Sequence, residues 1–282
     1  MAMHRRAIVQ SCLSDFPWYS FPSCNMQASF KLGDFTLADT RRRRIGMIVP
    51  ASNTHAEPDC LLLAPPGVTI HTTRSGGYDV AVIPDSDEMR RFARQALDQH
   101  LQLLVDGRVE LIVYACTSAT LADGPEFDQA FCDEITSKSG LPAVTAAGAL
   151  IEAIRDLGAK RVAFTSPYVP QLAAEAVDFI EQCGIDVVNQ LGYDKALSSL
   201  EQNALTPLDA YQMGLKADHQ QAELLVISCT DYRALEAVPA LEQALGKPVI
   251  TSNSALMYAS LKRLEIDMIG VGAGGYLFTR RN

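Results

Sequence analysis

The chain has 282 residues, of which 48% are hydrophobic, which is enough for a substantial core and excludes an intrinsically disordered protein. Its net charge of −9 excludes the basic surface typical of nucleic-acid binding, so no nucleic-acid partner is expected. No apolar run approaches the roughly 18–20 residues that span a bilayer, so no membrane association is expected.

The seven cysteines are irregularly spaced and form no CxxC pair, and the five histidines form no HxH or HExxH element. Zinc sites need such spacings, so the sequence predicts no metal site. A disulfide framework is implausible in a chain of this length. We therefore predict reduced thiols and a cytoplasmic protein.

The N-terminal segment, residues 1–44, shows no apolar stretch typical of a secretory signal. We predict a poorly ordered extension there. It ends in consecutive arginines, Arg41 to Arg44, which a solvated approach to the first strand explains better than a phosphate or nucleic-acid contact.

From Ile45 onward, short apolar strand patterns alternate with longer helical patterns. Strands are predicted at Ile45–Pro50, Val68–Thr72, Leu111–Tyr114, Pro142–Thr145, Arg161–Thr165, Ile185–Gln190, Leu224–Ser228 and Pro248–Thr251. Helices are predicted at Ser86–Leu104, Gly124–Lys138, Ala146–Leu157, Gln171–Cys183, Pro207–Asp218, Leu235–Leu245 and Ala255–Leu264. This alternation is typical of parallel βαβ units covered by helices on both faces, and it predicts an α/β fold.

The pattern contains a weak internal repeat. LIVYACTSAT (111–120) and LLVISCTDYRA (224–234) are both apolar strands followed by a small residue and then Cys-Thr. The repeat predicts two similar Rossmann-like parallel-sheet subdomains related by a pseudo-two-fold axis, over residues 45–148 and 149–249, with 250–282 returning to the first. Ligands of open α/β sheets bind beyond the carboxyl ends of strands, so we expect an active site in the cleft between the subdomains.

Cys116 and Cys229 are the candidate catalytic residues, because each ends a predicted strand and precedes a polar turn into a helix. Backbone N–H groups at such a turn can stabilise a thiolate, which acts as a nucleophile or base, whereas a protonated thiol acts as an acid. A single cysteine in this position is more often a buried structural residue. Two in matching contexts favour chemistry.

Three further segments follow predicted strands. In PASNTHAEPD (50–59), Asn53 can donate to a carboxylate or serve in an ordinary helix N-cap, and His55 lies beside it. In TSPYVP (165–170), Tyr168 projects into the cleft or packs over a loop. In TSNSALMY (251–258), Ser252 and Asn253 are expected to cap the last helix.

Motifs for nucleotide cofactors are missing from the sequence. It contains no GxGxxG after a first strand, no GxxxxGK[ST] and no GxSxG. Gly272, Gly274 and Gly275 are read as a turn. No cofactor is therefore expected.

Together these segments resemble the aspartate/glutamate racemase superfamily, and within it the maleate cis–trans isomerase and arylmalonate decarboxylase group. The matching stretches are IGMIVPASNTHAEPD (45–59), VYACTSAT (113–120), RVAFTSPY (161–168), LLVISCTDYRALEAVPALEQALGKPVITSN (224–253) and GAGGYLF (272–278). The resemblance covers nearly all of the chain after Arg44.

The resemblance implies specific roles for these residues. By analogy with maleate isomerases, Cys116 attacks the substrate double bond to give a succinyl-cysteine-like adduct, and Cys229 donates and accepts the proton. The substrate carboxylates are held by Asn53, Thr117, Ser118, Tyr168 and Thr230. The implied activity is a cofactor-independent isomerase of a small carboxylic acid.

Two features leave the substrate open. Arylmalonate decarboxylases keep only the second cysteine, so Cys116 argues against a plain decarboxylase. Maleate isomerases carry a substrate-binding Asn before the second cysteine, where this chain reads GYDKALSSLEQN, with Ser198 or Ser199 near that place and Asn203 further on. Arg233 is an alternative carboxylate contact.

Other activities on the same scaffold remain open. They are an amino-acid or hydantoin-type racemase, a malonate-type decarboxylase, an ectoine-utilisation-type protein, and a non-enzymatic small-acid binding protein. The expected partners are a small carboxylate substrate and further copies of the chain in a homo-oligomer.

Overall fold

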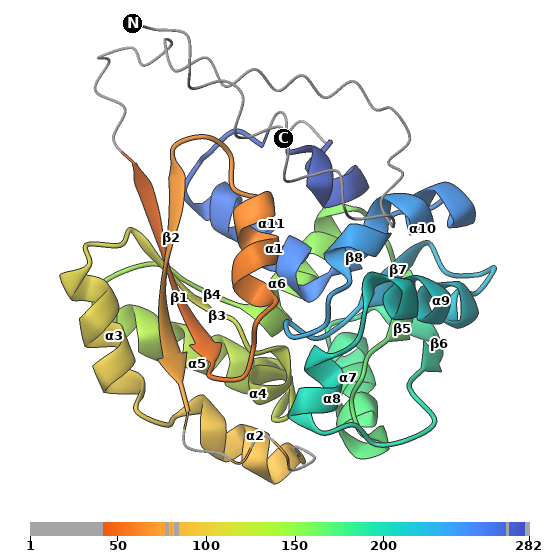
Figure 1. Cartoon of the computed structure of the whole chain (residues 1–282), viewed down its shortest axis with the longest axis horizontal. Coiled ribbons are helices and arrows are strands. Elements are labelled where there is room, and N and C mark those ends of the chain that lie inside the picture. Colours follow the sequence, from red (N-terminus) through yellow and green to blue (C-terminus); the bar gives the residue numbers. More distant parts are fainter. Residues whose placement is uncertain (1–41, 77–78, 80, 82–84, 269–270, 280–282) are drawn as a thin grey trace, which may run out of the picture. The chain divides into compact units, whose positions relative to one another are not determined.

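The computed structural model describes residues 42–76, 79, 81, 85–268 and 271–279 (Figure 1). Apart from residues 42–44, the predicted N-terminal extension lies outside these residues. Strand β1, Arg43–Pro50, begins inside the arginine run rather than at Ile45. The Arg43 guanidinium pairs with Glu110 at 2.6 Å, and Arg44 Nε donates to the Arg108 carbonyl oxygen at 2.7 Å. These two arginines therefore anchor β1 to the loop before β3.

Eight strands form two four-stranded parallel sheets within the described residues. The first sheet contains β1, β2 (Val68–Ser75), β3 (Leu111–Tyr114) and β4 (Ala143–Thr145). The second contains β5 (Arg161–Thr165), β6 (Asp186–Leu191), β7 (Leu224–Ile227) and β8 (Val249–Thr251).

The two sheets have the same topology. Their strand orders are β2-β1-β3-β4 and β6-β5-β7-β8, so each strand of the first has a counterpart four strands later in the second. This repeat confirms the predicted α/β class and the two similar Rossmann-like halves. β8 pairs with β7, so the chain leaves the second sheet after Thr251. The subdomain boundaries proposed above stay predictions.

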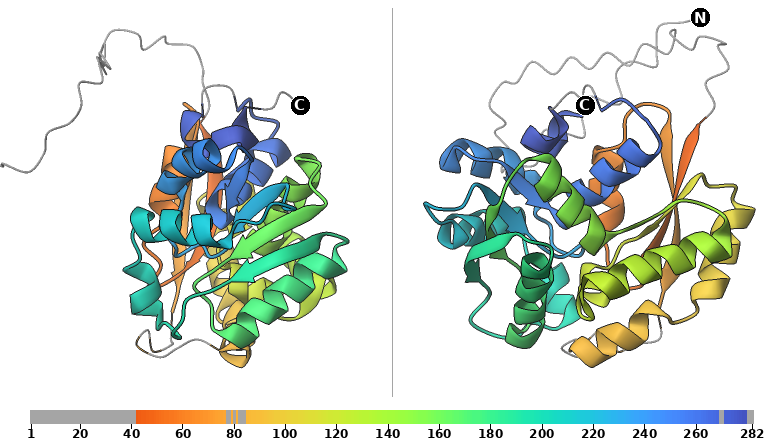
Figure 2. Two further views of the ribbon diagram at one scale, coloured as in Figure 1. Left: turned by 90° about the vertical axis from the view of Figure 1, so that its right-hand side faces the viewer. Right: turned by 180° about the vertical axis from the view of Figure 1, so that it is seen from behind.

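Helices connect the strands and pack against both sheets (Figures 1 and 2). The helices are α1 (Ala56–Leu62), α2 (Ser86–Ala93), α3 (Leu97–Asp106), α4 (Thr117–Leu121), α5 (Gly124–Ser139), α6 (Ala146–Asp156), α7 (Pro170–Gln182), α8 (Ser199–Asn203), α9 (Pro207–Ala217), α10 (Val238–Leu245) and α11 (Ser252–Arg263), with 3₁₀ segments η1 (Leu235–Ala237) and η2 (Gly272–Phe278). Among these helices, none is long and apolar enough to cross a membrane.

Several helical segments differ from the sequence prediction, and the short helices α1 and α4 were not among the predicted helices. The predicted helix 86–104 is divided into α2 and α3 at Ala96, which has a left-handed backbone with φ 52°. Helix 235–245 starts as the 3₁₀ segment η1, because Pro239 sits in the first turn of α10. The predicted turn at Gly272–Gly275 lies within η2, where Gly275 takes φ 65°. Helix α8 was not predicted.

The main hydrophobic core is shared by the two sheets. It contains Ile45 and Ile112 from the first and Val162 and Val226 from the second, all with essentially no exposure. In β7, Leu224 and Val226 join this cluster, whereas Leu225 and Ile227 pack into a second cluster on the other face. Both faces of β7 are thus buried, which explains its continuous apolar sequence.

Helices α6 and α11 join the halves. Each follows the last strand of its sheet, β4 or β8, and the two helices pack against each other. Helix α11 also packs on α1 of the first half, and its residues Ser252–Leu261 are all buried. The loops that follow the strands of both sheets are thereby held at fixed positions.

Candidate active site

The two candidate cysteines occupy equivalent places in the two sheets. The residue before each one extends the ladder to the neighbouring strand: Ala115 N donates to the Ile48 carbonyl oxygen at 2.8 Å, and Ser228 N donates to that of Thr165 at 2.8 Å. The chain then leaves the sheet and presents Cys116 before α4 and Cys229 after β7.

Both cysteines line one cavity of about 50 Å³. The structure therefore brings together two side chains that are more than a hundred positions apart in the sequence. Residues from both halves line this cavity: Pro50, Ser52, Asn53, Met89, Phe92, Cys116, Thr117, Ser118, Ser199, Gln202, Cys229, Thr230 and Asp231.

The loop of Cys229 is strained and tied to the first half. Cys229 has φ 125°, a backbone region that side-chain-bearing residues rarely adopt and that is typical of functional sites. Thr230 Oγ1 donates to the Ala115 carbonyl oxygen at 2.9 Å, directly before the other cysteine. It also accepts from Asn53 Nδ2 at 3.0 Å. Thr230 thus joins three loops of the cavity.

Asn53 supports the start of α1 and lines the cavity, and its contact with a substrate carboxylate stays a prediction. Its Oδ1 accepts from the backbone N–H groups of His55 and Ala56, each at 3.0 Å, so it caps the start of α1. The contact with Thr230 uses only one of its two amide N–H groups. Asn53 also lines the cavity.

The expectation that Ser252 and Asn253 cap the last helix is wrong. Thr251 is the cap: its Oγ1 accepts from Ser254 N at 3.0 Å, while Thr251 N donates to Ser254 Oγ at 2.8 Å. Because this Thr–Ser pair provides the capping box, the two residues between them are available for other contacts.

Ser252 links the loops of the two thiols. Its Oγ accepts from Cys229 N at 3.0 Å and from Thr117 Oγ1 at 2.9 Å. Asn253 supports the same loop, since its Nδ2 donates to the Thr230 carbonyl oxygen at 3.1 Å and to Asp59 Oδ2 at 2.8 Å. Ser252, Asn253 and Asp59 are buried. Ser252 and Asn253, with Asp59 behind them, thus support the loops of Cys116 and Cys229.

Tyr168 is buried behind the Cys229 loop and is not among the residues that line the cavity. Its hydroxyl pairs with Ser228 Oγ at 3.1 Å and lies within hydrogen-bonding reach of the Cys229 thiol. Burial raises its pKa well above its usual value, so the phenol stays protonated. From this position the protonated phenol can donate to the Cys229 sulfur. The predicted contact of Tyr168 with the substrate stays a prediction.

The thiols are less acidic than their place before a helix suggested. Burial raises the pKa of Cys116, partly offset by the Ser118 hydroxyl and the Ala119 N–H. Burial also strongly raises the pKa of Cys229, and the nearby Asp231 carboxylate adds to the rise. Desolvation of the sulfur outweighs the attraction of backbone N–H groups at both positions. Both thiols are therefore protonated near neutral pH.

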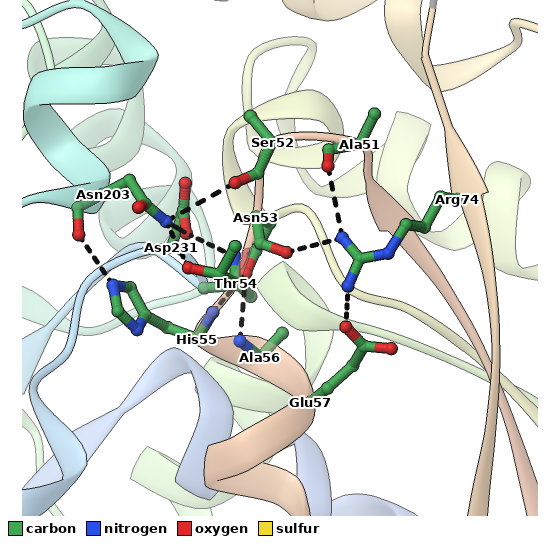
Figure 3. Close-up of polar contacts among 11 residues, drawn as sticks. Ala51, Ser52, Asn53, Thr54, His55, Ala56, Glu57, Arg74, Asn203 and Asp231 are labelled. Carbon is green, nitrogen blue, oxygen red and sulfur yellow. Dashed lines mark hydrogen bonds and ion pairs between the residues drawn. The ribbon is translucent and has the colours of Figure 1, made fainter.

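Asp231 and Asn203 close one side of the site, and the sequence prediction missed both roles (Figure 3). Asp231 Oδ1 accepts from Thr54 N at 3.1 Å and from Asn203 Nδ2 at 2.8 Å. Asn203 Nδ2 also contacts Thr54 Oγ1 at 2.7 Å, and the Asn203 carbonyl oxygen lies 2.7 Å from His55 Nε2. These contacts hold α8 against the loop after β1.

Helix α8 lies in the segment GYDKALSSLEQN, where the sequence left open which residue replaces the substrate-binding Asn of maleate isomerases. Ser198 caps the helix in a capping box with Glu201, a Ser-x-x-Glu signal that could have revealed α8. Ser199 and Gln202 line the cavity. Arg233, the other candidate, is exposed and pairs with Glu236 at 2.6 Å, outside the cavity lining.

A larger cavity of about 350 Å³ lies between α5, α6 and α7. Cys132 and Cys183 line it together with the buried Asp128, but neither cysteine follows a strand. The smaller cavity is the candidate active site because it joins the strand ends of both sheets that carry Cys116 and Cys229. No group of three or more His, Cys, Asp or Glu in this part of the chain is arranged to hold a metal.

The chain is similar to known proteins over most of its length. The family model described as arylmalonate decarboxylase matches residues 45–278. A maleate isomerase of Pseudomonas putida is 31% identical over 257 residues, which cover 84% of this chain and 98% of that protein. A maleate isomerase of Geobacillus stearothermophilus is 29% identical over 248 residues, covering 83% and 96%.

The fold is similar to that of a solved structure. The crystal structure of a cysteine-to-alanine variant of the maleate isomerase from Pseudomonas putida S16, with maleate, superposes with a TM-score of 0.78 at 28% identity. The match covers 84% of this chain and 97% of that one.

Proposed function

Because the chain belongs to the arylmalonate decarboxylase family, we propose that it is a cofactor-independent isomerase that converts a small cis-unsaturated carboxylic acid into the trans isomer through two thiols. The observation that carries this proposal is that Cys116 and Cys229 line one cavity from equivalent strand ends. The relatives named above are maleate isomerases, which makes a maleate-like acid the first substrate to test.

The proposed reaction begins with addition of Cys116. The minor fraction of Cys116 that has lost its proton to solvent attacks as a thiolate. Its sulfur bonds to one alkene carbon, and the π electrons move to the neighbouring carbon, which takes the proton of the Cys229 thiol. The product is a saturated thioether, in which the former double bond can rotate. The Cys229 thiolate then removes the proton again, the C–S bond breaks, and the trans alkene leaves. Atoms and electrons balance without a redox partner.

The pKa shifts of the two thiols fit these proposed roles. The stronger rise in the pKa of Cys229 keeps that thiol protonated, as a proton donor must be. Hydrogen bonding of the Cys116 sulfur with the Ser118 hydroxyl and the Ala119 N–H lowers its pKa against burial, so it is the thiol that ionises more readily. Asn53, Thr117, Ser118 and Thr230 are proposed to orient the substrate.

The test is to compare Cys116→Ala and Cys229→Ala with the wild-type protein for conversion of maleate to fumarate, followed by proton NMR. Each variant should lose turnover by about two orders of magnitude or more, because addition and proton transfer are both required. Cys183→Ala is the matched control and should retain activity. Turnover close to wild type in either active-site variant would contradict the mechanism.

The same spectra separate the other reactions that the scaffold supports. Deuterium uptake at a substrate α-carbon without cis–trans conversion would indicate a racemase, and release of carbon dioxide would indicate a decarboxylase. A cytoplasmic location and a homo-oligomeric state are part of the proposal and rest on the sequence alone.

A further inference from the structure

The cavity contains a carboxyl group that the proposed reaction does not use. Asp231 lines the cavity two residues after Cys229 and is half-buried. Its Oδ1 is fixed by Thr54 N and Asn203 Nδ2. The negative charge of this carboxylate raises the pKa of both the Cys116 and the Cys229 thiols, so it acts on both sulfurs of the site.

Positive charge to balance this carboxylate is scarce in the site. None of the residues that line the cavity is Lys, Arg or His within the described part of the chain. Arg74 lies nearby, but its guanidinium contacts Glu57 and the carbonyl oxygens of Ala51 and Asn53 (Figure 3). The His55 ring is bonded to the Asn203 carbonyl oxygen.

Gln202 adds a second acceptor from the same side of the site. Its Nε2 donates to the Leu197 carbonyl oxygen at 2.9 Å, which leaves its carbonyl oxygen as the acceptor end of the amide. Gln202 lines the cavity, and its helix, α8, is bonded to Asp231 through Asn203. Asp231 thus presents a carboxylate, whose oxygens bind N–H or O–H groups and repel a second carboxylate, and Gln202 adds an uncharged amide beside it.

Resting on the proposed function, we propose that Asp231 sets the substrate class. The enzyme acts on cis-unsaturated acids with one carboxylate and a second end that is uncharged and donates hydrogen bonds, such as the monoamide of maleic acid. A dianion brings two negative charges to a site that already holds a carboxylate and no lining cation. In a cavity shielded from water, this repulsion is much stronger than in bulk solution.

The test compares maleate with its monoamide, maleamate, at about pH 7.5, where both Asp231 and the second carboxyl of maleate are ionised. The ratio of kcat/KM for maleamate to that for maleate is measured by proton NMR for the wild type, Asp231→Asn and Asp231→Ser. The Asp231→Asn substitution keeps an oxygen to accept from Thr54 and Asn203 while removing the charge. Asp178→Asn, an exposed position on α7, is the matched control.

We expect the wild type to favour maleamate by at least roughly tenfold, and both Asp231 variants to lower that ratio by at least roughly tenfold, with Asp178→Asn unchanged. The ratio cancels any general gain in rate from more acidic thiols. A wild type that prefers maleate, or a ratio unchanged in both Asp231 variants, would overturn the assignment.

Binding of the saturated analogues succinate and succinamate, measured by calorimetry, separates the two proposals. If neither unsaturated acid is converted but succinamate binds more tightly in an Asp231-dependent way, the isomerase proposal fails and the charge selection holds. If maleate is converted efficiently and succinate binds as well as succinamate, the isomerase proposal holds and the selection by Asp231 is wrong.

Discussion

At the scale of single residues, the Ser252 hydroxyl connects the two loops that carry the cysteines. Ser252 Oγ accepts hydrogen bonds from the backbone of Cys229 and from the side chain of Thr117, the residue after Cys116. Together with the direct bond from Thr230 Oγ1 to the Ala115 carbonyl oxygen, it connects the loops of the two thiols. The relative position of the sulfurs therefore depends on a residue that touches neither of them.

Replacing Ser252 by Ala should lower kcat by about ten- to a hundredfold. The substitution leaves two buried donors unpaired, at a cost of about 1–3 kcal/mol, and frees the two loops to separate. Steady-state kinetics and thermal melting check this expectation. Ser254→Ala is the control, because it removes the helix-cap partner of Thr251 and should reduce stability while keeping kcat. Equal kcat in the two variants would refute the positioning role.

The reactivity of Cys116 should follow its raised pKa. Below that pKa, the thiolate fraction grows about tenfold for each pH unit, so alkylation by iodoacetamide should keep rising between about pH 7 and pH 9. Free cysteine, with a pKa of about 8.5, begins to level off in this range. Peptide mass spectrometry of Cys116 in the Cys229→Ala protein measures the rate. A plateau below about pH 8 would show that the thiol is instead acidic.

At the scale of elements, the short helix α8 controls one side of the cavity. It supplies Ser199 and Gln202 to the lining and is held in place by the side chain of Asn203. Its own hydrophobic contribution is small, since Leu200 is 53% exposed. The polar contacts of Asn203 therefore decide whether this element stays closed over the site.

Asn203→Ala should loosen α8 and weaken substrate binding more than it slows chemistry. KM should rise several-fold with a smaller change in kcat, and amide hydrogen exchange should accelerate across residues 199–203. Asn189→Ala is a matched control, because its amide also donates to a carbonyl oxygen, that of Ala217, but lies away from the cavity. Unchanged exchange in α8 would argue against this role of Asn203.

The sequence predicted strands more reliably than the polar connections between them. Period and composition located all eight strands. Strands such as β3 and β7, buried on both faces, leave an uninterrupted apolar pattern, whereas the edge strands β2 and β6 are only partly buried. The pattern of Cys-Thr after two of these strands located both thiols. The roles of Asp231, Asn203 and Ser252 depend on contacts between loops of the two halves, which no local pattern records. Ser and Thr are both common N-cap residues, so the sequence does not decide between Ser252 and Thr251. In the structure Thr251 is the cap, and Ser252 is available for other contacts.

At the scale of the whole molecule, the two halves share one core as well as one active site. Corresponding helices α6 and α11 pack against each other, and residues of both sheets enter the main hydrophobic cluster. The equivalent strand ends that carry the thiols are thereby held in a fixed relation. We expect the two halves to unfold together.

Buried carboxyl groups should make the stability of this fold depend on pH. Burial raises the pKa of Asp128 from 3.8 to about 6. The folded state then binds more protons than the unfolded state between these values. The stability that this group contributes is complete below about pH 4 and is lost as the pH rises through about 6. At pH 8 the loss is about 3 kcal/mol.

The Asp128→Asn substitution should remove the loss of folding stability that ionisation of Asp128 causes at high pH. The variant should melt several degrees above the wild type at pH 8, because the wild-type carboxyl must ionise in a buried place. At about pH 4, where Asp128 is protonated in the folded state and largely protonated in the unfolded state, the two melting temperatures should nearly coincide. Thermal melts by circular dichroism at both pH values are sufficient. An equal difference at both pH values would mean that packing, and not ionisation, separates the two proteins.

At position 229, stability and chemistry favour different residues. A backbone with φ 125° suits glycine, and any side chain there costs about 1–3 kcal/mol. A mutation to glycine should therefore increase the stability of the fold, and it removes the thiol that is proposed to transfer the proton. A lineage released from the need for this reaction gains stability by drifting to glycine at this site, so a cysteine that persists there is a sign of continuing selection for catalysis.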